Sequence, residues 1–422
     1  NVLEEKIICI KDSSFSSLAL LEKSIGDARI VMLGEQTHYD GTTFSAKIHL
    51  IKFLHEKMGF NVIAFEGDMY GLHKANEEVK NKMNVFHAMR KAIFSQWSES
   101  LEFQSFNNYL EANSSLILTG FDCQLTSAYT KDYLVTELKE LLFLDKQGLW
   151  KEDDFYLLES LITELAEGDL KNFANSPQDS LHFYSLIHKV EVSLHHIEVN
   201  FKPLAKKVSF WKQWLKSTLA CLQYTINEEQ KGKKSPVQNP RDAIMADNLI
   251  FLSNHYPNEK IIVWAASYHI TNQLDALDWD NPITDTILQT MGSEQEEDKV
   301  SLKTLLAGAV PMGQCLKKAG KATYSIGFIA QKGEYGRKGD TNMVFSVPFP
   351  PPASIENAFH HKGCKSGFIL LNTLPTTAYF SSPLGYLPIK ANWQNIFDCF
   401  FFSDTMYPIT PFIDSTDLLK KR

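Results

Sequence analysis

The sequence of 422 residues lacks an excess of positive charge and a long hydrophobic run, and each absence excludes a class of protein. With 42 Lys and Arg residues against 50 Asp and Glu residues, the net charge is -8. This balance argues against a nucleic-acid backbone or an anionic membrane as the main partner. No segment approaches the roughly 18 consecutive apolar residues that a membrane span needs, so we expect none. At 44% hydrophobic and 22% charged residues, the composition is that of an ordinary globular protein.

Paired cysteines are also lacking, because no C-x-x-C motif of a zinc ribbon or redox site is present. The cysteines stand singly at Cys9, Cys123, Cys221, Cys315, Cys364 and Cys399. This spacing favours isolated thiols, although the even count leaves disulfides open if the protein is exported. A location in the cytoplasm and export after removal of an N-terminal signal both stay open, as does the oligomeric state.

The common motifs of hydrolases and nucleotide-binding proteins are missing too. There is no G-x-S-x-G elbow, no H-E-x-x-H, no P-loop and no G-x-G-x-x-G after a strand. A serine nucleophile at Ser267 is therefore a minor alternative. His360 and His361, close to Cys364, lack a second group of metal ligands, and we expect solvated loop histidines there.

The sequence does contain short aliphatic runs, each followed by polar residues. They cover residues 28–33, 61–65, 116–121 and 260–265. Near-continuous apolar runs are typical of strands buried on both faces of a parallel sheet. The cluster at residues 397–402 is also expected to be a buried strand.

A helix is expected between the first two strands. Gly59 is expected to end this helix. The apolar residues that recur at helical spacing before it are Phe44, Ile48, Ile51, Leu54 and Met58. A strand, a helix and a strand in succession make the two strands parallel. We therefore predict an α/β fold, with a mostly parallel central sheet flanked by helices.

Leucines and aromatic residues recur at helical spacing from about residue 126 to 229. We interpret residues 124–236 as a helical insertion that covers an active-site cleft. Residues 1–123 and 237–422 would then be the first and second parts of the α/β core. Charged loops are expected at residues 228–240 and 292–299, and a stiff extended connector at residues 347–352.

Chemically capable side chains follow the predicted strands at the edge where ligands of such sheets bind. They are Glu35, His38, Glu66, Asp122 and His269. A neutral imidazole beside carboxylates is suited to removing a proton from water. In G-E-x-x-H, we expect Gly34 to allow a sharp turn, so that the Glu35 carboxylate orients the His38 ring.

Several roles stay open at this point. His269 could polarise a carbonyl or protonate a leaving alkoxide. Arg241, at the start of a predicted helix, could stabilise an oxyanion or pair with Glu66. Two histidines and several carboxylates would also suit a divalent ion such as zinc or manganese, which makes a metal site the alternative to a cofactor-free site.

The motifs of this sequence, in their order, resemble those of the erythromycin esterase family. The resemblance extends over residues 28–330 and is carried by Leu33-Gly34-Glu35-Gln36-Thr37-His38, Lys47, Gly59-Phe60, Ala64-Phe65-Glu66, Gly120-Phe121-Asp122, Arg241-Asp242, Met245-Ala246-Asp247-Asn248, Val263-Trp264-Ala265 and His269-Ile270.

The resemblance implies an α/β core with a helical part around a deep cleft. It also implies hydrolysis of a macrolide lactone by activated water, without an acyl-enzyme or a required metal. By position, His38 corresponds to the general base, Glu35 and Glu66 to acidic residues, His269 to the second histidine of W-A-H-N-x-H, and Lys47 to a basic residue. We therefore expect His38, Glu35, Glu66 and His269 to be catalytic, and Lys47, Arg241, Asp122 and Asp242 to contact the substrate or its oxyanion.

The sequence departs from the family pattern at a few positions. Ala266 and Ser267 replace the first histidine and the asparagine of W-A-H-N-x-H, and Thr42 replaces an acidic residue. We expect retained hydrolysis of a small-molecule ester or lactone, with macrolide resistance as the implied role. The alternatives are a metal-dependent hydrolase of another ester, for example one linked to polysaccharide, and a binding protein without turnover.

Overall fold

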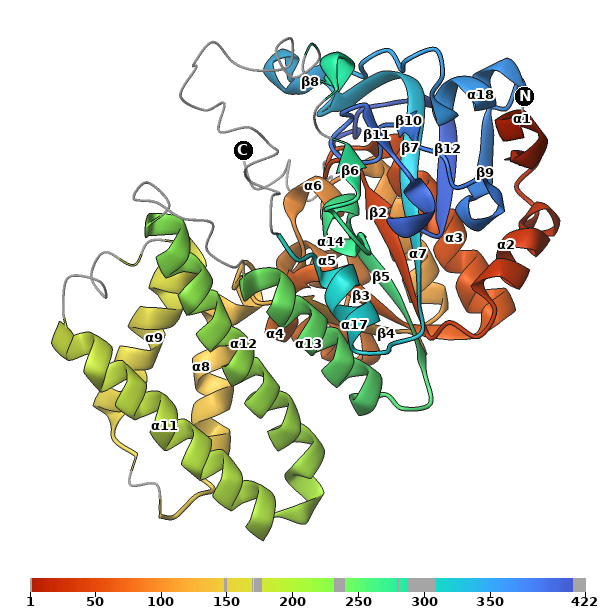
Figure 1. The fold of residues 1–422 in the computed structure, drawn as a ribbon. Helices are drawn as coiled ribbons and strands as arrows, with labels where there is room; N and C mark the ends of the chain where they lie inside the picture. Colours follow the sequence, from red (N-terminus) through yellow and green to blue (C-terminus); the bar gives the residue numbers. More distant parts are fainter. Residues whose placement is uncertain are drawn as a thin grey trace. The chain divides into compact units, whose positions relative to one another are not determined.

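The computed structural model describes residues 2–147, 150–168, 170, 177–230, 240–278, 281–284, 286 and 309–412 (Figure 1). The chain divides into two compact units. The first comprises Asn1–Ala64, Ser95–Ile117 and Asn258–Arg422, and the second comprises Phe65–Phe94 and Leu118–Pro257. The predicted division at residues 123 and 236 stays a prediction.

The central element is a nine-stranded, mostly parallel sheet. Its order is β1-β9-β12-β7-β2-β5-β3-β4, and β8 pairs with β7. The strands are β1 (Ile8–Cys9), β2 (Ile30–Glu35), β3 (Phe60–Asp68), β4 (Ile117–Asp122), β5 (Lys260–Ala266), β7 (Thr323–Gly336), β8 (Val344–Ser346), β9 (Ser366–Leu370) and β12 (Cys399–Met406). The predicted α/β fold is confirmed, and β2, β3, β4 and β5 lie where the aliphatic runs predicted strands.

The register explains why these strands are apolar along their whole length. β2 pairs in parallel with β5 on one side and β7 on the other, so Met32 lies between Val263 and Ser325. Every residue of β2 is buried. β12 pairs in parallel with β7 and antiparallel with β9, which in turn pairs antiparallel with β1. A small second sheet consists of β6 (Leu277–Asp278), β10 (Tyr379–Ser381) and β11 (Ile389–Ala391).

Helix α3 (Gly41–Met58) follows β2, as the sequence predicted. It ends at Gly59, whose φ of 70° lies in the left-handed region that favours glycine. The helix packs against α7 (Leu101–Ala112) and β12. Among the described residues, the other α-helices of the first unit are α1 (Val2–Lys6), α2 (Ala19–Ile25), α6 (Ser95–Ser98), α14 (Ser267–Ile270), α17 (Met312–Lys318) and α18 (Ile355–His361).

The second unit is mostly helical, and several of its helices are coloured yellow to green in Figure 1. The α-helices among its described residues are α4 (Met69–Lys80), α5 (Val85–Ala92), α8 (Ala128–Leu142), α9 (Glu152–Glu167), α11 (Pro177–Asn200), α12 (Ala205–Gln230) and α13 (Pro240–His255). α12 packs against α11 and α13, and α8 packs against α4 and α9. Helices therefore occur where leucines and aromatic residues recur at helical spacing. That they cover a cleft stays a prediction.

Some local expectations need correction. α12 continues to Gln230, so the first residues of the loop predicted at 228–240 are helical. Residues 231–239 and the loop predicted at 292–299 lie outside the described residues. His360 and His361 occupy the last turn of α18 rather than a loop, and the His360 Nδ1 atom lies 3.3 Å from the Asp404 carboxylate.

Two of the cysteines expected to be isolated form a disulfide. Cys9 of β1 and Cys364, just after α18, have Cα atoms 5.3 Å apart. They meet because β1 pairs with β9 and α1 packs against α18. This long-range pairing brings together residues that are 355 positions apart, which the sequence spacing alone does not reveal. Cys123, Cys221, Cys315 and Cys399 are free thiols.

Candidate active site

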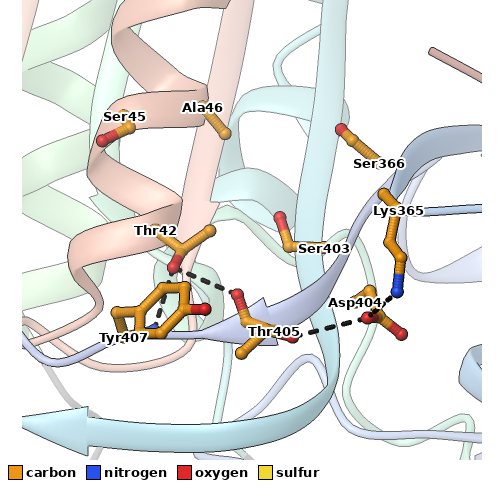
Figure 2. Close-up of a pocket in the computed structure, with 9 residues that line it drawn as sticks. All are labelled: Thr42, Ser45, Ala46, Lys365, Ser366, Ser403, Asp404, Thr405 and Tyr407. Carbon is orange, nitrogen blue, oxygen red and sulfur yellow. Dashed lines mark hydrogen bonds and ion pairs between the residues drawn. The ribbon is translucent and has the colours of Figure 1, made fainter. Parts of the chain in front are cut away.

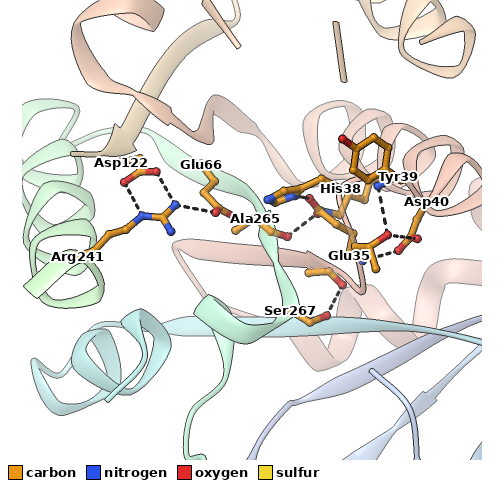
Figure 3. Close-up of polar contacts among 12 residues, drawn as sticks. Glu35, His38, Tyr39, Asp40, Glu66, Asp122, Arg241, Ala265 and Ser267 are labelled. Carbon is orange, nitrogen blue, oxygen red and sulfur yellow. Dashed lines mark hydrogen bonds and ion pairs between the residues drawn. The ribbon is translucent and has the colours of Figure 1, made fainter. Parts of the chain in front are cut away.

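The first unit joins Glu35 and His38 as G-E-x-x-H predicted. Glu35 is the last residue of β2 and is fully buried. The His38 Nδ1 atom lies 3.0 Å from Glu35 Oε1 (Figure 3). The His38 ring also packs edge-on against Trp97. The His38 side chain is 28% exposed, so water can reach the imidazole while the carboxylate beneath it cannot be reached.

Lys47 of α3 contacts the other oxygen of the same carboxylate. Its Nζ atom donates to Glu35 Oε2 and, at 3.0 Å, to the backbone oxygen of Ala265. The ammonium lies 4.7 Å from the centre of the Trp264 ring. Both Lys47 and Glu35 side chains are fully buried, so Lys47 compensates the charge of Glu35. The substrate-binding role expected for Lys47 stays a prediction, and these contacts favour a positioning role.

The turn that carries His38 is held by Asp40, which is not among the predicted site residues. The Asp40 carboxylate accepts hydrogen bonds from the Thr37 backbone N–H (2.8 Å), the Thr37 hydroxyl (2.7 Å) and the Tyr386 hydroxyl (2.8 Å). Burial raises the pKa of Asp40 to about 6, against the opposing effect of these donors. An Asp just before a helix is a sequence signal that could have indicated Asp40. No comparable signal indicates Tyr386, which lies far along the chain.

Gly34 has a different role from the one expected. It lies within β2 and does not have a positive φ, so it is not needed for a sharp turn. A Cβ atom at this position would lie 2.7 Å from the Cα of Ser267 and 2.6 Å from the Ile270 side chain. Glycine is therefore required because α14 packs directly against the end of β2.

α14 carries His269, which is 6% exposed and lies next to the Tyr268 ring. The Ser267 hydroxyl is buried and donates to the Gly34 backbone oxygen at 2.7 Å. This bond fixes α14 to the strand that ends at Glu35 and gives Ser267 a structural role. Ala266 is the register partner of Glu35 on the neighbouring strand β5. The departure from the family pattern thus lies directly beside the buried carboxylate.

In the second unit, Arg241 binds two of the predicted acidic residues (Figure 3). Its Nε and Nη2 atoms donate to the two oxygens of Asp122 at 3.1 and 2.7 Å, and Nη2 also donates to Glu66 at 3.0 Å. Burial disfavours the charged guanidinium, but the charges of Asp122 and Glu66 outweigh it and raise the pKa of Arg241 well above its ordinary value. The ion pair between Arg241 and Glu66, one of the two roles left open for Arg241, is therefore present in this unit. The other role, stabilisation of an oxyanion, stays a prediction.

Asp242, next to Arg241 in the first turn of α13, is fully buried. A further buried acid, Asp68, caps α4 through the Tyr70 and Gly71 N–H groups and accepts a hydrogen bond from the Ser127 N–H. Burial raises the pKa of Asp68 to about 6. Asp68 is not among the predicted site residues, although an Asp before a helix is a common cap. That the five strand-end side chains share one rim stays a prediction.

The alternative of a metal site depends on a suitable set of ligands. Within the described ranges, no group of three or more His, Cys, Asp or Glu side chains is arranged to hold a metal ion. The described helices also include none that is long and apolar enough to cross a membrane.

The sheet order and the loop after β2 define an α/β protein whose His and carboxylate pair lies at the carboxyl end of a central parallel strand. The family model described as Erythromycin esterase matches residues 55–392. The chain therefore belongs to the erythromycin esterase family, a membership that places it among hydrolases and confirms the resemblance noted in the sequence.

Individual relatives resemble the chain in sequence or in fold. The chain is 26% identical over 360 residues to "Putative hydrolase YbfO" of Bacillus subtilis (strain 168), which covers 81% of this chain and 74% of that protein. It resembles the structure of a succinoglycan biosynthesis protein with a TM-score of 0.67 and 16% identity, over 97% of this chain and 96% of the other. It also resembles a mutant of erythromycin esterase EreC in its open conformation, with a TM-score of 0.59 and 17% identity, over 96% and 97% of the two chains.

Proposed function

We propose that the protein hydrolyses a carboxylic ester or lactone with water activated by His38. The observation that carries the proposal is the buried Glu35 carboxylate, which contacts the His38 imidazole through one oxygen and the Lys47 ammonium through the other. A partly exposed imidazole with a fixed, charge-compensated carboxylate behind it has the arrangement of a general base with an orienting partner.

In this mechanism the His38 Nδ1–H donates to Glu35, which leaves Nε2 as the proton acceptor. Nε2 removes a proton from water as the water oxygen forms a bond to the ester carbonyl carbon. The negative charge of Glu35 stabilises the imidazolium that results. Collapse of the tetrahedral intermediate breaks the bond to the alkoxide, which takes a proton from His38 or His269. Lys47, which is fully buried, positions Glu35.

The relatives indicate where to look for the substrate. One structural relative is an erythromycin esterase, and another is named for succinoglycan biosynthesis. Macrolide lactones and esters carried by saccharides are therefore the substrate classes to assay. A role in macrolide resistance would follow only from turnover of a macrolide.

A second candidate function is ligand binding without turnover. It is favoured by Ala266, which lies beside Glu35 where the family pattern has a histidine. The intact contact between Glu35 and His38 favours catalysis instead, because a binding site needs no oriented base. Tight binding of a macrolide or ester with no product, measured by mass spectrometry, would support this second candidate.

The test of the first candidate compares purified wild type with His38→Gln on erythromycin and a panel of esters. We expect a product heavier by one water for a lactone, and a loss of at least about a hundredfold in kcat in the variant. His188→Gln is the matched control, because the His188 side chain is 76% exposed on α11. Unchanged turnover in His38→Gln would contradict the mechanism. Loss of folding is checked by circular dichroism.

A metal-dependent form of the reaction needs its own test. Activity is measured before and after dialysis against a chelator, together with the metal content of the protein. We expect activity to survive chelation if His38 alone activates the water. Loss of activity that zinc or manganese restores would favour the metal alternative.

A further inference from the structure

A pocket of about 480 Å³ lies in the first unit, beside the first turns of α3 and the end of β12. It is lined by Thr42, Ser45, Ala46, Lys365, Ser366, Ser403, Asp404, Thr405 and Tyr407, and we call it the hydroxyl pocket (Figure 2). Its volume falls within the range of about 300–1,000 Å³ that small-molecule sites have. Its hydroxyl-rich lining differs from the mostly apolar lining of such sites.

The hydroxyl pocket lies at the edge of the sheet where ligands of α/β proteins bind. β12 runs parallel to β7, and β7 runs parallel to β2, so their carboxyl ends share one edge. Glu35 ends β2 at that edge. The N–H of Gly41, three residues after His38, donates to the backbone oxygen of Tyr407 at 3.0 Å. The wall of the pocket is thus continuous with the loop of the proposed base.

Two hydroxyls of the pocket are available to a ligand. Ser403 and Ser366 are directly opposite in the pairing of β12 with β9, so their side chains lie on the same face. Ser403 is only 8% exposed, yet its hydroxyl makes no hydrogen bond to any residue in the described part of the chain. The hydroxyl is not among the side-chain atoms closed to solvent, and Ser403 lines the pocket, so it is accessible to a ligand that enters there.

Other hydroxyls of the pocket are engaged within the protein. Thr42 donates to the Thr405 backbone oxygen at 3.2 Å and accepts from the Tyr407 N–H at 2.9 Å. Ser45 donates to the Gly41 backbone oxygen at 3.3 Å. The Thr405 hydroxyl donates to Asp404 at 3.4 Å. These bonds hold the pocket wall in place, and Ser366 and Ser403 are free of them and can contact a ligand.

The rim of the pocket offers both charges and an aromatic ring. The Lys365 ammonium lies 2.8 Å from an oxygen of Asp404, which also lies near Lys332 and His360. The Lys365 side chain is 82% exposed, and Tyr407 is 64% exposed. A purely apolar ligand would desolvate these groups without compensation. A ligand with many hydroxyls can donate to Asp404 and accept from Lys365 at the same time.

We propose that the hydroxyl pocket binds a saccharide unit. A sugar ring donates and accepts hydrogen bonds around its edge, which suits Ser366, Ser403 and the pair of Lys365 and Asp404. Its apolar face suits the exposed ring of Tyr407. This inference rests on the proposed function in one respect. The sugar is taken to be part of the ester or lactone substrate, and its binding in the pocket would hold that substrate near His38.

The test measures binding separately from catalysis, in His38→Gln protein. Methyl glycosides of glucose, galactose and glucuronic acid are titrated while backbone amide signals are followed by NMR. We expect saturable shifts at Ser366, Ser403 and Thr405 for at least one glycoside, neutral or acidic. Ser403→Ala and Ser366→Ala should each weaken this binding roughly fivefold, as expected for loss of one hydrogen bond.

The matched control is Ser105→Ala, an exposed serine of α7 away from the pocket, which should leave glycoside binding unchanged. Inorganic phosphate is titrated in parallel. Saturation by phosphate without binding of any glycoside would overturn the proposal and indicate an anion site, and absence of any shift would overturn it too. Glycoside binding that persists where esterase activity is never found would leave the pocket standing and the proposed hydrolysis without support.

Discussion

At the scale of single residues, we expect the loss of the Lys47 ammonium to lower both the stability and the activity of the protein. It is fully buried, and its ammonium contacts the carboxylate that orients His38. Lys47→Met leaves this carboxylate buried without a cation, so we expect a loss of about 3–5 kcal/mol in the free energy of unfolding. Urea unfolding followed by fluorescence measures it. The same change should lower kcat, because Glu35 loses its fixed position.

A second change separates the ion pair from the packing of the Lys47 side chain. Lys47→Met combined with Glu35→Gln removes both charges, and we expect it to recover most of the lost stability. Lys212→Met is the surface control, since Lys212 and Glu198 are both 36% exposed and such pairs contribute about 0–1 kcal/mol. Equal losses in all three proteins would show that the buried pair has no special role.

At the scale of elements, the turn between β2 and α3 depends on a tyrosine distant in sequence. Tyr386→Phe removes the hydroxyl that donates to Asp40, and a lost hydrogen bond of this kind costs about 0.5–3 kcal/mol. We expect the Thr37 N–H, which also bonds Asp40, to exchange with solvent faster in the variant. Hydrogen exchange measured by NMR is the readout. Tyr184→Phe, at an exposed position of α11, is the control and should change nothing.

The same element shows how far the sequence could predict the fold. The apolar run of β2, the spacing of α3 and the stop at Gly59 are local signals, so both elements were predictable. The contact of Glu35 with His38 was also predictable, because three residues separate them on one loop. The pairing of Cys9 with Cys364 and the contact of Asp40 with Tyr386 depend on long-range packing, which leaves no periodic signal. The need for glycine at position 34 arises from the close approach of α14, which only the three-dimensional structure reveals.

At the scale of the whole molecule, buried carboxyl groups should shape how stability depends on pH. Burial raises the pKa of Glu356 to about 7, and the pKa values of Asp40 and Asp68 to about 6. Glu356 and Asp40 lie in the first unit, and Asp68 lies in the second unit. A folded-state pKa above the unfolded value means that the folded protein binds the proton more tightly. The contribution is fully present below the unfolded pKa and is lost as pH rises through the folded one.

Glu356 allows this effect to be isolated. Its Oε1 atom accepts from the Ser381 hydroxyl at 2.8 Å and the Ser382 N–H at 2.7 Å, whereas its buried Oε2 atom has no partner among the described residues. Glu356→Gln resembles the protonated acid but does not titrate. The free energy of unfolding of the variant, relative to wild type, should therefore rise by about 3 kcal/mol between pH 4.5 and pH 8. Denaturation by urea at both pH values measures it, and a difference independent of pH would show that Glu356 stays ionised in the folded protein.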